Sequence, residues 1–254
     1  MLLTQYIDKE VFNLMLVFTR MAGGLMTMPG YGEAYVQPKA RLMLSFALAL
    51  LLTPVVAQYL PPVTQNPIAL AVLLAGEALI GVFLGTLARF MFTALEVGGV
   101  IIGFQMSLSN AFAFNPSLKQ QGSIIGVILT TTGIVLIFVL DLHHLMLAAL
   151  VDSYAVFVPG KALPLNDFSE ALVIALNQAF IIAVQLGSPF IVIGLTFYLG
   201  MGLLGRLMPQ LQIFFLAIPI QLMVGTIILS TAFSGIMLWF FSHYESMLEE
   251  LLVR

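Results

Sequence analysis

Apolar runs that are too long and too numerous for a soluble core are the feature that most limits how this chain folds. Apolar residues make up 61% of the 254 positions and charged residues only 8%, far from the composition of globular domains. Clusters of proline, glycine and asparagine separate the runs, and the alternation typical of strands is absent, so the runs predict helices. Six helical segments are expected, at about 11–28, 40–60, 68–103, 168–208 and 211–252, with a fourth that begins at about 124 and either ends early or continues as an amphipathic piece to 157. We therefore expect an all-α, polytopic membrane protein.

Three of these segments are longer than a simple membrane crossing requires. Residues 68–103 form about 36 residues of helix, roughly 54 Å against a hydrocarbon core of about 30 Å. The last two segments, of about 40 residues each, predict one long hairpin with interruptions at Gly187-Ser188-Pro189 and at Pro219. Either they kink, or much of their length lies outside lipid. The loop 159–167 is the expected boundary between two domains, residues 1–158 and residues 159–254.

Several functional classes receive no support from the residue types. The net charge of −3 predicts no basic surface for nucleic acid, and the absence of cysteine removes disulfides and thiolate sites. Gly160-Lys161 lacks the earlier glycine of a phosphate loop, and we find no nucleophile motif or catalytic pair of carboxylates. We expect no enzymatic activity and no cofactor. Asp8, Lys9 and Glu10 replace the basic start of a signal peptide, so the first helix is expected to be retained.

The three histidines do not predict a metal site. His143 and His144 are adjacent, so on a helix they diverge by about 100° and cannot chelate one ion as an i, i+4 pair does. His243 stands alone near the end of the chain. Interfacial or packing roles are favoured over metal binding.

The loop charges do not predict an orientation in the membrane. In a six-span arrangement Lys and Arg divide almost evenly between the two sides, so the positive-inside rule gives no direction. This fits chance in a chain so poor in charge, or a protein whose placement is set by partner subunits. The groups are Lys9, Lys161 and Arg254 on one side and Lys39, Arg41, Lys119 and Arg206 on the other.

Ionisable residues inside apolar helices are costly and need partners or water. Each costs roughly 2.5 to 3.5 kcal/mol on insertion scales. Arg89 and Glu96 share a helix face but lie about 10 Å apart, so their partners are expected on other helices or other chains. A proton relay is one interpretation; interhelical or inter-subunit ion pairing is favoured because no dense chain of carboxylates is found. The residues expected in buried interhelical or inter-subunit contacts are Arg20, Glu77, Arg89, Glu96 and Arg206.

Small and amide residues indicate helices that pack on protein along much of their surface. Three glycine pairs have the GxxxG spacing that lets backbones approach closely, and amides occur in the long hairpin. Together they favour an assembly over a lone bundle. The pairs are Gly81 with Gly85, Gly99 with Gly103 and Gly122 with Gly126, and the amides are Asn177, Gln178, Gln185 and Gln221.

The segment 103–122 is the one that looks functional. It is rich in amides, hydroxyls and bulky apolar side chains, which suits neither lipid nor a free linker. Irregular backbone at membrane depth is tolerated where it is buried in protein or lines an aqueous cavity, so a pore-lining loop is one interpretation and an exposed loop in water is the other. Large apolar groups can close a passage by excluding water, which favours the pore. The candidate gate residues are Phe104, Met106, Asn110, Phe112, Phe114 and Pro116.

The whole chain resembles the FliR family of type III secretion export-gate subunits, flagellar and injectisome. The resemblance is carried by Arg20-Met-Ala-Gly-Gly with Met28-Pro-Gly-Tyr-Gly, by the run from Ala75 to Val82, by the segment 103–122, and by Gly205-Arg-Leu-Met-Pro-Gln-Leu-Gln-Ile-Phe at the hairpin turn. Together these motifs are specific, although each alone is not.

The resemblance implies a structural subunit of the flagellar export gate in the bacterial inner membrane, at the basal body. Its partners would be FliP and FliQ in a closed helical channel, FlhB and FlhA in contact with it, unfolded export substrates in transit, and membrane lipid. Residues 1–158 would resemble FliP, residues 159–254 would resemble FliQ, and 103–122 would plug the channel, with Met106, Phe112 and Phe114 as gating residues.

A secondary transporter is the competing hypothesis. The broken helix at Gly187-Ser188-Pro189 would then form a binding site at the membrane midplane. A substrate-binding cluster and repeats of comparable size, which such a protein would need, are not visible in the sequence.

Overall fold

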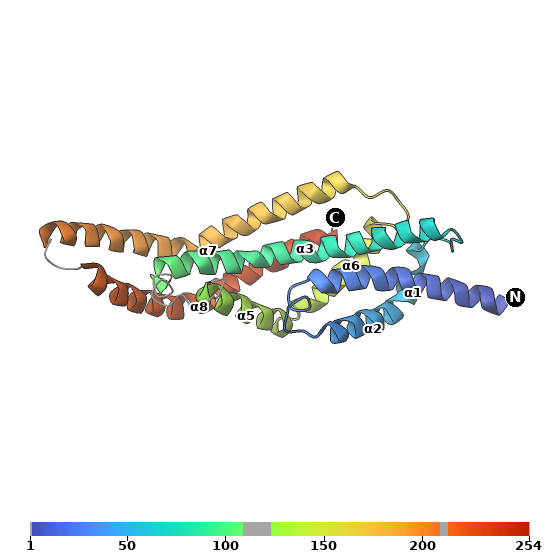
Figure 1. Ribbon diagram of the computed structural model, residues 1–254, viewed down its shortest axis with the longest axis horizontal. Helices are drawn as coiled ribbons and strands as arrows, with labels where there is room; N and C mark the ends of the chain where they lie inside the picture. Colours follow the sequence, from blue (N-terminus) through green and yellow to red (C-terminus); the bar gives the residue numbers. More distant parts are fainter. Residues whose placement is uncertain (1, 109–122, 209–212, 254) are drawn as a thin grey trace. The chain divides into compact units, whose positions relative to one another are not determined.

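The described portion of the chain is helical throughout. The computed structural model describes residues 2–108, 123–208 and 213–253, and within these ranges it contains helices and no strand, which confirms the all-α expectation (Figure 1). The elements are α1 Leu2–Thr27, α2 Pro38–Val56, the 3-10 turn η1 Ala57–Tyr59, α3 Pro67–Gln105, α5 Ile124–Val139, α6 Leu142–Val156, α7 Leu165–Leu207 and α8 Ile213–Val253.

The chain is polytopic, as the apolar runs predicted. Among the described residues, four helices are long and apolar enough to span a membrane: Pro38–Tyr59, Pro67–Gln105, Leu165–Leu207 and Ala217–Glu249. The pair α5 and α6 qualifies together as a fifth, broken span. α1 is not among them, so the described residues contain four or five candidate spans where six helical segments were expected. Asn13 and Arg20 lower the apolarity of α1, and both are buried against protein.

The segment 124–157 is two helices rather than one continuous helix. α5 and α6 meet at a bend of 75°. Asp141 lies at this bend with φ of +58°, in the left-handed region that aspartate tolerates better than most residues. Its N–H donates to the carbonyl of Phe138 at 3.4 Å, and α6 begins at the next residue.

Two compact units make up the structure, and they do not follow the boundary at 158/159. Unit 1 comprises Met1–Met91, Ile134–Leu176 and Glu245–Arg254; unit 2 comprises Phe92–Gly133 and Asn177–Tyr244. Each unit takes residues from both sides of the expected boundary. The expected likeness of residues 1–158 to FliP and of residues 159–254 to FliQ stays a prediction.

Unit 1 depends on a close approach of α1 and α3. A Cβ at Gly81 would collide with the backbone carbonyl of Arg20 and the backbone nitrogen of Gly24. One turn further along α3, a Cβ at Gly85 would collide with Gly24 and Thr27. The GxxxG pair therefore serves to bring two helix backbones together.

Unit 2 also contains a close approach of helix backbones through glycine, at a second place on α3. Gly99 lies against Gly126 of α5, where an added Cβ would meet the Gly126 backbone. Gly187 of α7 packs on the side chain of Ile101. Pro189 and Pro219 lie inside α7 and α8, both of which continue as helices through these residues.

Candidate functional site

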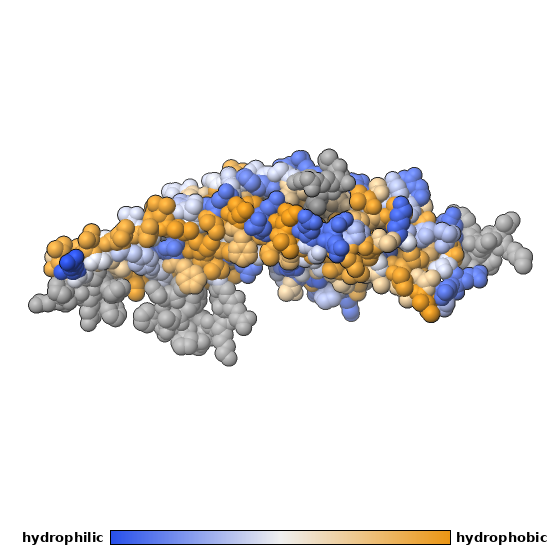
Figure 2. Space-filling view, turned by 90° about the horizontal axis from the view of Figure 1, so that it is seen from above, coloured by the Kyte–Doolittle hydropathy of each residue, from blue (hydrophilic) through white to orange (hydrophobic). Residues whose placement is uncertain are grey.

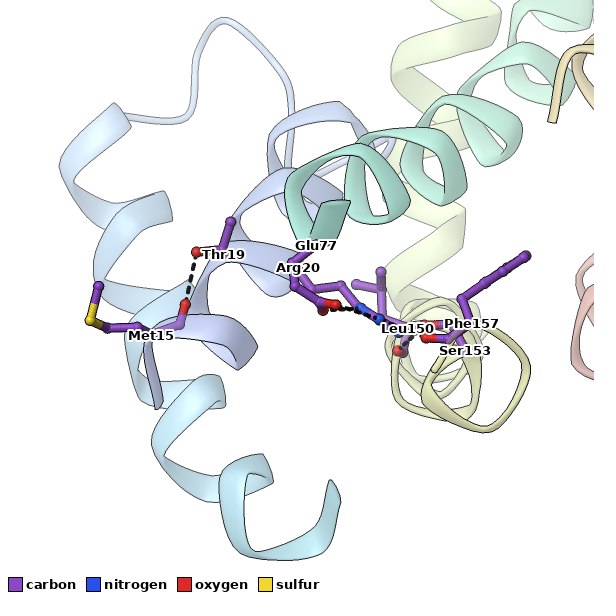
Figure 3. Close-up of polar contacts among 7 residues, drawn as sticks. All are labelled: Met15, Thr19, Arg20, Glu77, Leu150, Ser153 and Phe157. Atoms are coloured by element: carbon purple, nitrogen blue, oxygen red, sulfur yellow. Dashed lines mark hydrogen bonds and ion pairs between the residues drawn. The ribbon is translucent and has the colours of Figure 1, made fainter. Parts of the chain in front are cut away.

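A buried arginine joins three helices of unit 1. The Arg20 side chain on α1 is fully buried and faces Glu77 of α3, with Nε donating to one carboxylate oxygen at 2.7 Å and Nη2 to the other at 3.0 Å (Figure 3). Nη1 donates to the Ser153 hydroxyl of α6 at 3.0 Å, and Nη2 also donates to the Phe157 carbonyl at 2.8 Å. The ring of Tyr154 lies 3.7 Å from the guanidinium carbon.

This arrangement has the geometry of a structural contact that holds α1, α3 and α6 together. A bidentate pair satisfies both carboxylate oxygens of Glu77, and the remaining guanidinium donors reach α6. Such pairing offsets the cost of removing two charges from water. The contacts therefore correspond to interhelical ion pairing rather than to a chain of proton carriers. Sequence reasoning found Arg20 and Glu77 but missed Ser153 and Tyr154, which carry no distinguishing pattern.

The other predicted arginine of α3 binds the loop that follows α1. Arg89 Nη2 lies 3.1 Å from a carboxylate oxygen of Glu33, and Arg89 Nη1 donates to the Thr27 carbonyl at 3.3 Å. Arg41 Nη2 donates to the carbonyls of Glu33 at 2.9 Å and of Val36 at 3.3 Å. Two arginines thus hold the loop 28–37. Glu33 was not predicted as a partner, because it lies outside the apolar runs.

Two of the predicted polar residues are exposed. Glu96 faces outward from the middle of α3, and Arg206 faces outward near the end of α7. Their assignment to inter-subunit contacts stays a prediction.

The gate candidates divide between described and undescribed residues. Phe104 is 60% exposed and Met106 only 2% exposed, because the Met106 side chain packs against Gly225 of α8. The other four candidates, Asn110, Phe112, Phe114 and Pro116, lie outside the described residues. The gating role of all six stays a prediction.

An amide contact at the end of α3 was not predicted as a site. Gln221 of α8 donates from Nε2 to the Gln105 carbonyl at 2.5 Å and accepts at Oε1 from the Ser107 hydroxyl at 2.6 Å. Ser107 and Gln221 are both buried. The only sequence signal was an amide inside an apolar helix, which indicated packing on protein without identifying the partner.

The histidines at the bend between α5 and α6 lie closer together than expected. The rings of His143 and His144 have centroids 4.0 Å apart, so the prediction that these two side chains diverge was wrong. Ligand atoms of Asp141, His143 and His144 lie within 4.8 Å of one another, but the side chains of Asp141 and His144 are 77% and 69% exposed. The expectation of interfacial or packing histidines stays a prediction.

The structure gives the transporter hypothesis no broken helix at the described residues 187–189. The residues Gly187 to Pro189 remain helical within α7, and Ser188 donates its hydroxyl to the Gln185 carbonyl at 2.8 Å. Phe190, directly after the proline, is 2% exposed. The helix therefore continues through this segment, although α7 changes direction along its length in Figure 1.

Comparisons with known proteins match nearly the whole chain. Residues 11–247 match the family described as bacterial export proteins, family 1. The chain is 36% identical over 240 residues to the flagellar biosynthetic protein FliR of Caulobacter vibrioides, covering 94% of this chain and 96% of the relative. It is 30% identical over 225 residues to FliR of Bacillus subtilis, covering 87% and 86%. It is also 31% identical over 188 residues to Yop proteins translocation protein T of Yersinia pestis, covering 72% and 70%.

Proposed function

The chain belongs to the bacterial export proteins of family 1, the family of the flagellar biosynthetic protein FliR, and from this premise we propose that it forms part of the export channel itself. As a family member it is a membrane component of the type III export apparatus. Together with homologues of FliP and FliQ it builds the passage for unfolded flagellar proteins, and homologues of FlhB and FlhA contact this assembly. Residues 103–122 plug the passage.

The observation that carries this proposal is the length of exposed apolar surface on α7. Large apolar side chains that are at least partly open to the surroundings run from Val173 to Leu207, roughly 50 Å along the helix. A hydrocarbon core of about 30 Å covers such a length only at a tilt well above the usual limit of about 40°. Lipid therefore leaves part of this surface uncovered, and neighbouring subunits are the remaining apolar cover.

The rest of the molecule supports the same interpretation. Figure 2 shows apolar residues spread over much of the visible face. The exposed apolar residues of unit 2 include Val192, Leu195, Met223 and Leu238, all more than 60% exposed. A soluble or lone membrane protein would leave such surface open to water wherever lipid does not reach. Partner helices of similar composition would cover it.

A leak measurement tests the plug. Residues 109–119 are replaced by the same number of glycine and serine residues, so that α3, α5 and the Ser107 contact are kept. The expected result is faster passage of small solutes across vesicles that carry the assembled complex. The same replacement in the loop 61–66 is the control and should leave the vesicles closed. If the variant assembles and leaks no faster than the unchanged chain, the plug has to be dropped.

A further inference from the structure

The end of α3 adopts a conformation that its own residues do not favour. Ser107 has φ of +58°, a left-handed conformation in which a Cβ crowds the following carbonyl. The Ser107 N–H donates to the Phe104 carbonyl at 3.1 Å, and the Met106 N–H donates to the Ile102 carbonyl at 2.9 Å. Glycine is the usual residue at such a position. Something outside α3 must therefore stabilise this turn.

Gln221 supplies that stabilisation from α8. The last carbonyls of a helix have no N–H of their own helix to accept from, and Nε2 of Gln221 donates to one of them, the Gln105 carbonyl, at 2.5 Å. Oε1 of the same amide accepts from the Ser107 hydroxyl at 2.6 Å. One buried side chain thus bridges the residues on both sides of Met106.

The neighbouring side chains fix the same turn by shape. The Met106 side chain occupies the space beside Gly225, one turn beyond Gln221 on α8, where a Cβ would collide with it. The Gln105 side chain occupies the corresponding space beside Gly194 of α7. Both glycines line the same small cavity as Gln105, Met106 and Gln221, and the end of α3 lies beside α7 and α8 in Figure 1. All of these residues belong to unit 2.

We propose that Gln221 is a positioning residue that caps α3 from α8 and so fixes the direction in which the backbone leaves α3 at Ser107. Leucine would fill the same apolar surroundings, but it would leave the Gln105 carbonyl and the Ser107 hydroxyl buried without this partner. The cap makes the geometry at the entry to the segment after Ser107 depend on α8. Its consequence for the passage rests on the proposed export function, whereas the cap itself does not.

Amide hydrogen exchange of the assembled complex tests the cap directly. In Gln221→Leu, exchange of the peptide covering 102–108 should become about tenfold faster, because a buried hydrogen-bonded partner is lost and the helix end opens more often. Gln185→Leu is the matched control, since Gln185 is an exposed amide on α7, and it should leave this peptide unchanged. Unchanged exchange in Gln221→Leu would overturn the proposal.

A second pair of variants keeps the test decisive if Gln221→Leu fails to assemble. Ser107→Ala removes only the hydroxyl and keeps the unfavourable φ, so exchange should rise. Ser107→Gly removes the same hydroxyl but favours a positive φ, so exchange should rise less. Equal exchange in Ser107→Ala and the unchanged chain would contradict the cap.

A solute-leak assay on the same variants separates the two proposals. Faster exchange in Gln221→Leu together with faster leak supports both the cap and the plug. Faster exchange without faster leak keeps the cap and overturns its consequence for the passage, and the plug is then decided by the 109–119 replacement alone. Exchange in Gln221→Leu that is no faster than in the unchanged chain overturns the cap, whatever the result of the leak assay.

Discussion

The two compact units solve the problem of polar groups inside apolar helices in different ways. Unit 1 buries a full ion pair, Arg20 with Glu77, and adds two acceptors for Arg20, the Ser153 hydroxyl of α6 and the Phe157 carbonyl just after α6. Unit 2 buries a neutral amide, Gln221, on a helix end. Removing one partner from a buried ion pair leaves an uncompensated charge, whereas a neutral amide leaves only an unpaired dipole. Breaking the Arg20–Glu77 contact in unit 1 should therefore cost more free energy than breaking the Gln221 contact in unit 2.

The largest loss of stability is expected when one charge of the buried ion pair in unit 1 is removed. Arg20→Ala leaves Glu77 buried without its partner, and we expect destabilisation by about 3–5 kcal/mol and little chain in the membrane fraction. Accumulation after membrane extraction measures this, with Lys9→Ala, an exposed position, as control. Arg20→Leu combined with Glu77→Leu should recover part of the loss, because both charges are then gone. Equal accumulation of Arg20→Ala and the control would show that the buried ion pair does not stabilise unit 1.

The next largest loss of stability is expected where a glycine lies against the backbone of another helix, and it should be similar in both units. Gly81→Ala in unit 1 and Gly99→Ala in unit 2 each place a Cβ against the backbone of another helix, and each should cost roughly 1–3 kcal/mol. Gly76→Ala lies on the same helix with only Leu163 at 3.9 Å, so it should be neutral or slightly stabilising. Thermal unfolding of the purified protein in detergent compares the three variants. A Gly76→Ala variant as unstable as Gly81→Ala would remove close approach as the explanation.

A smaller effect of opposite sign is expected at Tyr154. Its ring lies on the Arg20 guanidinium, while its buried hydroxyl has no hydrogen-bond partner among the described residues. Tyr154→Phe keeps the ring and removes the unpaired hydroxyl, so stability should be unchanged or rise by up to about 1 kcal/mol. Tyr154→Leu loses the ring and should be less stable than Tyr154→Phe. The reverse order in thermal unfolding would show that the hydroxyl has a partner the structure does not describe.

The smallest effect belongs to the partly exposed pair of unit 1. Glu33→Gln removes the charge that faces Arg89, whose side chain is 42% exposed, and should cost at most about 1 kcal/mol. The cost should shrink in high salt, because such pairs are screened. Thermal unfolding at low and high salt measures this. A cost comparable to that of Arg20→Ala would mean that exposure does not separate the two ion pairs.

Helix positions were largely predictable from the sequence, and the partners of polar residues were not. The run 68–103 became α3 at Pro67–Gln105, because a long apolar run without proline favours a continuous helix. Which residue meets Arg20, by contrast, depends on how α1, α3 and α6 cross, and Glu77 and Ser153 lie 57 and 133 positions away. The bend at Asp141 was missed because aspartate tolerates both helical and left-handed backbone. For α1, the sequence predicted that Arg20 is buried against protein, but not which helices it meets.

We expect partner subunits to cover the exposed apolar surface of this chain. Native mass spectrometry of the complex, extracted in mild detergent from cells that produce it with homologues of FliP and FliQ, tests this most directly. The expected result is a single assembly of defined stoichiometry that contains this chain and both partners. A stable, monodisperse monomer as the native form would contradict it.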